Sequence, residues 1–108
     1  MHKKNNIHII KKDFEQCRTI LNAIGDENRQ NIIIALLGTI ATAGLRVGEI
    51  TKLSHLSRPA VSHHLQILKR ENIISMRSIG TMNFYYMNAS SSVMKLKKLI
   101  DDIEMCIK

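Results

Sequence analysis

The chain has 108 residues, 44% of them apolar, and its 16 Lys and Arg outnumber its 9 Asp and Glu by seven. This length supplies one hydrophobic core and excludes two independent domains, so we predict a single domain over residues 1–108. The surplus of positive charge favours a polyanionic partner, although solubility alone also explains a basic surface.

The sequence indicates neither an export signal nor a membrane span. The apolar residues 7–10 are interrupted by His8 and followed by two lysines, unlike a signal peptide. The uncharged run over residues 32–45 is shorter than the ~20 residues that a bilayer span needs. The two cysteines, Cys17 and Cys106, form no C-x-x-C pair and no secreted disulfide framework. We therefore expect a cytoplasmic protein with both cysteines as thiols.

Two helices are predicted in the first third of the chain. Residues 1–10 are expected to form a flexible N-terminal arm. Apolar residues then recur every three or four positions and predict a helix over residues 13–24, through Phe14, Cys17, Leu21 and Ile24. Asp26 is a suitable N-cap for a second helix over residues 27–37. Because this second helix is apolar almost all round, we expect it at the centre of the domain.

A helix, a tight turn and another helix follow in order. The first of these is predicted over residues 45–54, with one apolar side formed by Leu45, Val47, Ile50 and Leu53. Only His55 and Leu56 separate it from the next helix, over residues 57–71. This order is the outline of a helix-turn-helix, in which the second helix enters the major groove of DNA with its N-terminal turn leading.

The second helix of this pair has two different faces. Ser57 is a fitting N-cap, Leu56 can pack against Val61, and Pro59 costs little in the first turn. The apolar arc that faces a core consists of Val61, Leu65 and Leu68. The other arc can hydrogen-bond base edges or phosphates, and it consists of Arg58, Ser62, His63, Gln66, Lys69 and Arg70.

A β-hairpin and a last helix complete the predicted domain. Residues 73–78 and 82–87 carry β-branched, Met and aromatic residues and are joined around Gly80, which supplies a positive φ. A two-stranded hairpin must pack against helices to be stable. Ser91 or Ser92 is expected to cap the last helix.

The last helix carries a narrow apolar seam. Its members alternate steps of three and four and are Val93, Leu96, Ile100, Ile103 and Ile107. Such a seam needs a partner helix, either in its own domain or in a second copy of the chain. We favour the second copy, because the first helix has a comparable stripe and a small dimer gains core by pairing its terminal helices.

Two segments carry a further signal. Residues 23–29, AIGDENR, open the second helix, and residues 57–65, SRPAVSHHL, begin the second helix of the helix-turn-helix. With the hairpin and the last helix, these segments resemble the ArsR/SmtB family of winged helix-turn-helix transcriptional regulators. The resemblance implies a mainly α fold with a small β-hairpin: five helices plus a two-stranded wing, dimeric through the first and last helices. It also implies a repressor that an inducer releases from a palindromic DNA operator.

The resemblance also implies which residues bind DNA. The base-reading positions fall on Arg58, Ser62 and His63, which helical geometry selects independently, with Ser57 and Ala60 beside them. Gln66 projects with this group, whereas His64 lies at the edge of the apolar side and is expected to be packed. Phosphate contacts are expected from Lys52, Lys69, Arg70 and the N-terminal lysines. The hairpin tip, with Arg77, Ser78 and Thr81, resembles the wing that contacts the backbone or the minor groove.

The sequence departs from the family at its metal sites. Metal-sensing members carry a Cys-x-Cys pair where this chain has Arg46 and Gly48. At the other family site, near the two ends of the last helix, this chain has Ser90, Ser92, Ile103 and Cys106. Since soft metals need thiolate or imidazole ligands, we predict neither a bound metal nor a cofactor.

Several alternatives remain open. Cys17 and Cys106 could form a disulfide or persulfide switch, although a cysteine in an apolar stripe more often only packs. An unusual metal site that recruits His2 or His8 is another option. A constitutive DNA-binding regulator without sensing and a winged-helix protein-interaction module are the rival functions. We predict no enzyme, because no Ser/His/Asp set, carboxylate pair or glycine-rich phosphate loop is found.

Overall fold

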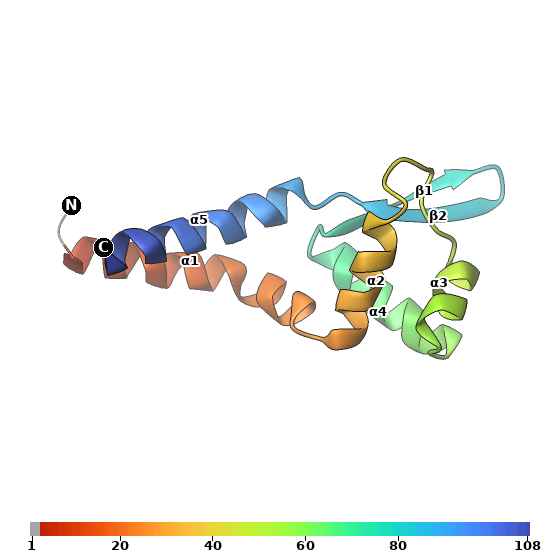
Figure 1. Ribbon diagram of the computed structural model, residues 1–108, viewed down its shortest axis with the longest axis horizontal. Helices are drawn as coiled ribbons and strands as arrows, with labels where there is room; N and C mark the ends of the chain where they lie inside the picture. Colours follow the sequence, from red (N-terminus) through yellow and green to blue (C-terminus); the bar gives the residue numbers. More distant parts are fainter. Residues whose placement is uncertain (1–2) are drawn as a thin grey trace.

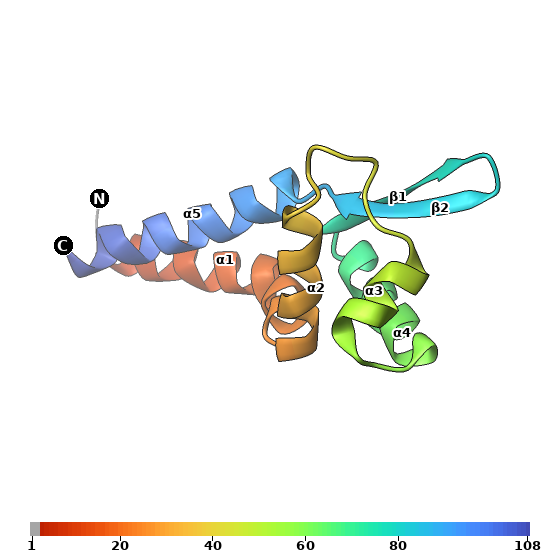
Figure 2. The same cartoon turned by 45° about the vertical axis from the view of Figure 1, so that its right-hand side comes forward.

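The computed structural model describes residues 3–108 and shows five helices and one hairpin, as the sequence predicts. The elements in chain order are α1 (Lys3–Ile24), α2 (Glu27–Leu37), α3 (Val47–Ser54), α4 (Arg58–Arg70), β1 (Ile74–Ile79), β2 (Met82–Met87) and α5 (Ser90–Ile107). Figure 1 shows α1 and α5 lying side by side as a long projection, with α2, α3, α4 and the hairpin gathered in a head at its other end. Figure 2 shows the same arrangement after rotation.

The molecule is elongated. Its principal extents are 55 × 24 × 19 Å and its radius of gyration is 16.6 Å. A compact chain of this length has a radius of gyration of about 13 Å. The difference reflects the projection of α1 and α5, which pack only on each other over most of their length (Figures 1 and 2).

Helix α1 begins ten residues earlier than predicted. The expectation of a flexible arm over residues 1–10 is wrong for residues 3–10, which are helical, and Met1 and His2 lie outside the described residues. Ile9 and Ile10 are half-buried, so the apolar stripe of α1 extends further toward the N-terminus than the prediction allowed. The reason is tertiary, because α5 runs antiparallel beside this segment and offers a surface on which it packs.

Helix α2 has the predicted bounds but is less buried than predicted. Asp26 caps it, and its Oδ1 accepts a hydrogen bond from the backbone N–H of Arg29 at 3.0 Å, which lowers the pKa of Asp26. Ile32 and Leu36 are buried, whereas the side chain of Ile34 is 65% exposed. The expectation of a central helix is therefore correct for one face only, because the other face has no neighbouring element within residues 3–108.

The start of α3 also differs from the prediction. Leu45 is extended, not helical, because its N–H and C=O both pair with the backbone of Tyr85 at 2.9 and 2.7 Å. The helix begins at Val47 and buries Ile50, but Leu53 is 62% exposed, contrary to the expected apolar side. The short helix thus follows a bridge that ties it to the hairpin.

One core joins the helix-turn-helix to the hairpin. Its buried members are Ala23, Ile32, Leu36, Leu45, Ile50, Val61, Leu65, Leu68, Ile73 and Ile74. The hairpin is antiparallel, with Ile79 opposite Met82 at its tip and Ile74 opposite Met87 at its base. Gly80 has the predicted positive φ, of 62°. The hairpin therefore rests on the helices at its base and extends freely at its tip.

The last helix starts at Ser90, and neither predicted serine caps it. Ser92 is buried, and its hydroxyl donates a hydrogen bond to the carbonyl of Glu71 at 2.6 Å. The side chain of Glu71 also accepts a hydrogen bond from the Thr19 hydroxyl at 2.6 Å. Both long helices are thus bonded to the residue that ends α4.

The apolar seam of α5 is divided between two environments. Leu96 and Ile103 are half-buried beside α1, whereas Val93, Ile100 and Ile107 are exposed. Exposed apolar residues also recur along α1 at Ile7 and Phe14. We call these five exposed residues the α1/α5 seam: Ile7, Phe14, Val93, Ile100 and Ile107. Helical geometry places them on one side of the antiparallel pair.

Gly44 is required where the loop after α2 meets β2. Its φ is +111°, and a Cβ added there would lie 2.1 Å from the carbonyl oxygen of Tyr85. We predict that Gly44→Ala lowers the free energy of unfolding by about 2–3 kcal/mol, because the Leu45–Tyr85 pairing must shift. Denaturant unfolding measures this change.

Gly48 provides the matched control. It lies in α3, and a Cβ there meets nothing within 4 Å. Gly48→Ala should be neutral or stabilising by up to ~1 kcal/mol. Equal stability of the two variants would contradict the role of Gly44.

Candidate nucleic-acid interface

Helix α4 is oriented by its cap and by its buried side. The Ser57 Oγ accepts a hydrogen bond from the Ala60 N–H at 3.3 Å, and Pro59 lies in the first turn, both as predicted. Val61, Leu65 and Leu68 are at most 1% exposed. Because these side chains face the core, the remaining arc of α4 faces outward.

The outward arc of α4 is polar and cationic. Its exposed residues are Ser57, Arg58, Ser62, His63, Gln66, Lys69 and Arg70, with Ala60 half-buried among them. Lys52, on α3, is exposed as well. Among the described side chains, none of these cations forms a salt bridge, since the three ion pairs present involve Lys98 and Lys108 only. Their charge is therefore available to an external anion.

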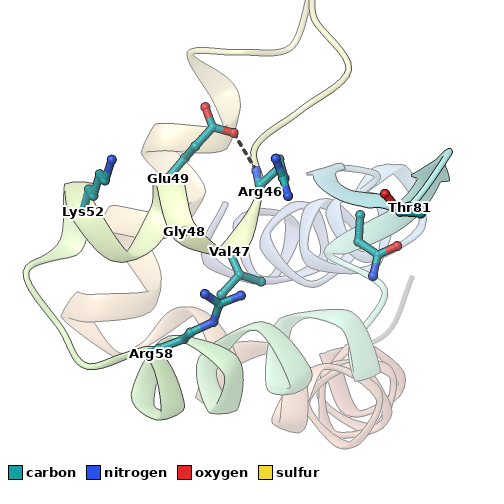
Figure 3. A pocket seen from close by; sticks show the side chains of 8 residues that line it. Arg46, Val47, Gly48, Glu49, Lys52, Arg58 and Thr81 are labelled. Atoms are coloured by element: carbon teal, nitrogen blue, oxygen red, sulfur yellow. Dashed lines mark hydrogen bonds between the residues drawn. The ribbon is translucent and has the colours of Figure 1, made fainter.

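An open cleft of about 450 Å³ separates the helix-turn-helix from the hairpin tip. It is lined by Arg46, Val47, Gly48, Glu49, Lys52, Arg58, Thr81 and Asn83 (Figure 3). Three cations face one carboxylate there, and Glu49 already accepts a hydrogen bond from the backbone N–H of Arg46 at 2.9 Å. Local fields from such a cleft favour an anion.

The cleft contains two residues that sequence reasoning missed. Arg46 contributes to the basic charge of the predicted helix-turn-helix, but it was not predicted as a DNA-contacting residue. Asn83 required knowledge of the strand register, since it lies opposite Ser78 and accepts a hydrogen bond from the Ser78 hydroxyl at 2.7 Å. No local pattern in the sequence signals Asn83.

The three predicted wing residues have different surroundings, and Ser78 bonds Asn83 as described above. Thr81 is at the hairpin tip and lines the cleft with Arg58. The guanidinium of Arg77 instead lies 3.9 Å from the ring centre of Tyr86, in a cation–π contact. Arg77 is paired with Phe84, on the strand face opposite to that of Asn83. The structure therefore brings Thr81, but not Arg77, to the cleft.

The neighbouring histidines differ as predicted. His63 is exposed beside Ser62, whereas His64 is half-buried. The Nδ1 of His64 lies 3.1 Å from a terminal guanidinium nitrogen of Arg29. Burial lowers the pKa of His64, and the nearby Arg29 charge lowers it further against the opposing effect of Asp26.

The other expected features of the site are placed as follows. The start of α1 lies at the far end of the projection from α4 (Figure 1). Among the side chains of residues 6–108, no three His, Cys, Asp or Glu lie close enough together to hold a metal ion, and His2 is outside this range. In the part of the chain that the structure describes, no helix is both long and apolar enough to span a bilayer.

Comparison with known proteins gives concordant matches. A family model described as "Bacterial regulatory protein, arsR family" matches residues 26–76. An uncharacterized HTH-type transcriptional regulator of Methanocaldococcus jannaschii is 34% identical over 92 residues, covering 83% of this chain and 97% of the relative. The transcriptional repressor SdpR of Bacillus subtilis is 35% identical, and the match covers 66% of this chain and 74% of SdpR. The solved structure of reduced HlyU from Vibrio cholerae matches with a TM-score of 0.64 and 25% identity, over 82% of this chain and 90% of HlyU.

The two cysteines are too far apart for an intrachain disulfide. Cys17 is buried, and its thiol donates a hydrogen bond to the carbonyl of Lys95 at 3.4 Å. Cys106 lies eleven residues beyond Lys95 on the straight helix α5. At 1.5 Å per residue this separation is about 16 Å, against the ~4 Å between Cβ atoms that a disulfide requires. A switch by direct pairing within one chain is therefore excluded by the structure.

We predict that the two thiols react at different rates. Burial, and secondarily the charge of Asp13, raise the pKa of Cys17, so its reactive thiolate is scarce. Cys106 is only half-buried. Alkylation by iodoacetamide, followed by mass spectrometry, should label Cys106 at least tenfold faster than Cys17, an order-of-magnitude expectation. Denatured protein, in which both react alike, is the control. Faster labelling of Cys17 would refute the prediction.

Proposed function

The chain belongs to the ArsR family of bacterial regulatory proteins, and we propose that it is a homodimeric repressor that an inducer releases from a palindromic operator. Membership makes it a DNA-binding transcriptional regulator, not an enzyme. The Bacillus subtilis relative is a transcriptional repressor, which supports repression here. A regulator of this kind acts on DNA in the cytoplasm.

The observation that carries the proposal is the unpaired, polar and cationic arc of α4. An α-helix fits the major groove of B-DNA, where base edges present distinct hydrogen-bonding patterns. Arg58 is long enough for a bidentate contact with guanine, and Ser62, His63 and Gln66 lie on the same exposed arc. Ser57 and Ala60 adjoin them at the leading turn. We assign base reading to this group.

Phosphate contacts complete the proposed interface. Lys69 and Arg70 continue the arc of α4, and Lys52 faces the cleft with Arg46. In this assignment one DNA backbone lies along the cleft between α3 and the hairpin tip, where Thr81 and Asn83 supply polar contacts. Arg77, held against Tyr86, has a lesser part. Such contacts bind DNA of any sequence and weaken steeply as salt rises.

The α1/α5 seam is the surface that we assign to dimerisation. Exposed large apolar side chains recur every seven residues along both helices, and a second pair of helices is needed to bury them. The radius of gyration, above that of a compact chain, points to the same need. A twofold dimer presents two copies of α4, which matches an operator with half-sites about one helical turn, ~34 Å, apart.

Arg58 provides the test of sequence reading. We predict that Arg58→Ala costs about 1–3 kcal/mol of binding free energy on the specific operator, through lost base contacts, and much less on random DNA. Fluorescence anisotropy with a duplex from the region upstream of the protein's own gene, against a shuffled duplex, measures the difference.

Lys52→Ala is the control for the Arg58 experiment. A lost phosphate contact should weaken binding to both duplexes equally and should reduce the slope of log K against log salt concentration by about 0.9. If Arg58→Ala affects the two duplexes equally, the base-reading role of Arg58 is wrong. If neither duplex binds, the proposed function is wrong.

Ile100 provides the test of the dimer. Placing a charge at a buried apolar contact costs several kcal/mol, so Ile100→Glu should shift the protein from dimer to monomer in analytical ultracentrifugation. Met94→Glu, which puts the same side chain about 120° away from Ile100 around α5, at a residue that is 70% exposed, should leave the dimer intact. A monomeric wild-type protein, or an intact Ile100→Glu dimer, contradicts the assignment.

A further inference from the structure

Arg29 joins three elements at one point. Its Nε donates a hydrogen bond to the carbonyl of Ala23 at 2.6 Å, and a terminal nitrogen donates to the carbonyl of Asn22 at 3.2 Å. Both carbonyls belong to the last turns of α1. The other terminal nitrogen lies 3.1 Å from Nδ1 of His64, on α4. One guanidinium, carried by α2, therefore links the end of α1 to α4, which we call the recognition helix because we propose that it reads DNA.

The chemistry of this contact fixes the state of His64. A guanidinium has five N–H donors and no acceptor, and it stays protonated in proteins. His64 must therefore accept the hydrogen bond at Nδ1, which requires a neutral ring with its proton on Nε2. The protonated imidazolium has two donors and no acceptor, so it cannot form this contact.

The surroundings of His64 disfavour the charged ring. The charged groups that face it are Arg29 and Asp26 from the α2 end and His63 from its own helix, whose ring centre is 5.9 Å away. The contribution of α1 is limited to the neutral carbonyls that bind Arg29. Burial is the largest influence and lowers the pKa, as do Arg29 and His63, while Asp26 acts in the opposite direction.

We propose that the Arg29–His64 hydrogen bond positions the recognition helix against α1, and that protonation of His64 breaks this bond and weakens DNA binding. The inference rests on the proposed function, since it concerns the same DNA-binding helix. His64 is a positioning residue here, because it faces the core side while His63 and Ser62 face outward. Two donors placed together repel, so the turn of α4 that carries Ser62 and His63 must shift away from Arg29.

The sign of the pH effect follows from the preference for the neutral ring. The unfolded chain takes up the proton near the ordinary pKa of 6.5, before the folded chain does. Acidification below pH 6.5 therefore lowers the free energy of unfolding through His64. Protonation of the exposed His63 has the opposite effect on DNA binding, because it adds a positive charge that faces the phosphates. The two histidines must be separated experimentally.

The first measurement does not involve DNA. Long-range ¹H–¹⁵N correlation spectra of histidine side chains distinguish the two neutral tautomers. We expect His64 in the Nε2–H form at pH 7.5, with a pKa below the ordinary value of 6.5. A proton on Nδ1, or a pKa of His64 at or above 6.5, overturns the inference whatever the protein binds.

The second measurement tests the effect on DNA. Affinity of the wild-type protein for the duplex from upstream of its own gene should fall from pH 7.5 to pH 5.5 about tenfold more than that of a His64→Asn variant, the effect of one lost charge-assisted hydrogen bond. His64→Asn keeps an acceptor near the Nδ1 position but does not titrate, and any effect of His63 is common to both proteins. His64→Leu should give weak binding at both pH values, while circular dichroism confirms that the variant is folded.

The outcomes separate the two proposals. An equal fall in affinity in the wild-type protein and in the His64→Asn variant refutes the role of His64 but leaves DNA binding in place. Absence of binding at both pH values in wild-type protein refutes the proposed function, and the tautomer measurement then still decides whether the Arg29–His64 bond exists.

Discussion

The burial of three side chains on one side of α4 constrains what the rest of the molecule can present. Val61, Leu65 and Leu68 are almost completely removed from solvent. Burying each contributes about 1.5–3 kcal/mol, more than the ~1 kcal/mol expected from the Ser57 cap, so packing decides the rotation of the helix. Once that rotation is set, helical geometry determines which residues face outward, and the exposed arc is polar, with Arg58 at one end and Lys69 and Arg70 at the other.

The pairing of Leu45 with Tyr85 has the corresponding role for the hairpin. Two backbone hydrogen bonds attach the chain just before α3 to the middle of β2, so the hairpin and the helix-turn-helix meet at a fixed spacing. The cleft lies directly beyond this attachment, with Arg46 next to Leu45 in the chain. The shape of the cleft therefore depends on a backbone contact and not on an ion pair, so salt should leave that shape intact.

The sequence predicted the elements well and their surroundings less well. The bounds of α2, the Ser57 cap and the two faces of α4 follow from local spacing, which is why they agree with the structure. The early start of α1, the extended Leu45 and the exposed Leu53 depend on contacts between distant segments, which periodicity does not contain. The outward arc of α4 was predictable for the same local reason. The presence of Asn83 in the cleft depends on the strand register, and the position of Arg77 outside it depends on the contact with Tyr86, neither of which local spacing indicates.

Glu71 receives a bond from each of the two long helices, from Thr19 on α1 and from Ser92 on α5, immediately after the last turn of α4. Thr19 binds the side-chain carboxylate of Glu71 and Ser92 binds its backbone carbonyl, so sliding one helix along the other would stretch these two bonds. Hydrogen bonds of 2.6 Å tolerate only small displacements before they weaken. A change in the register of α1 against α5 would consequently disturb the contacts at the end of α4, and with them the orientation of that helix.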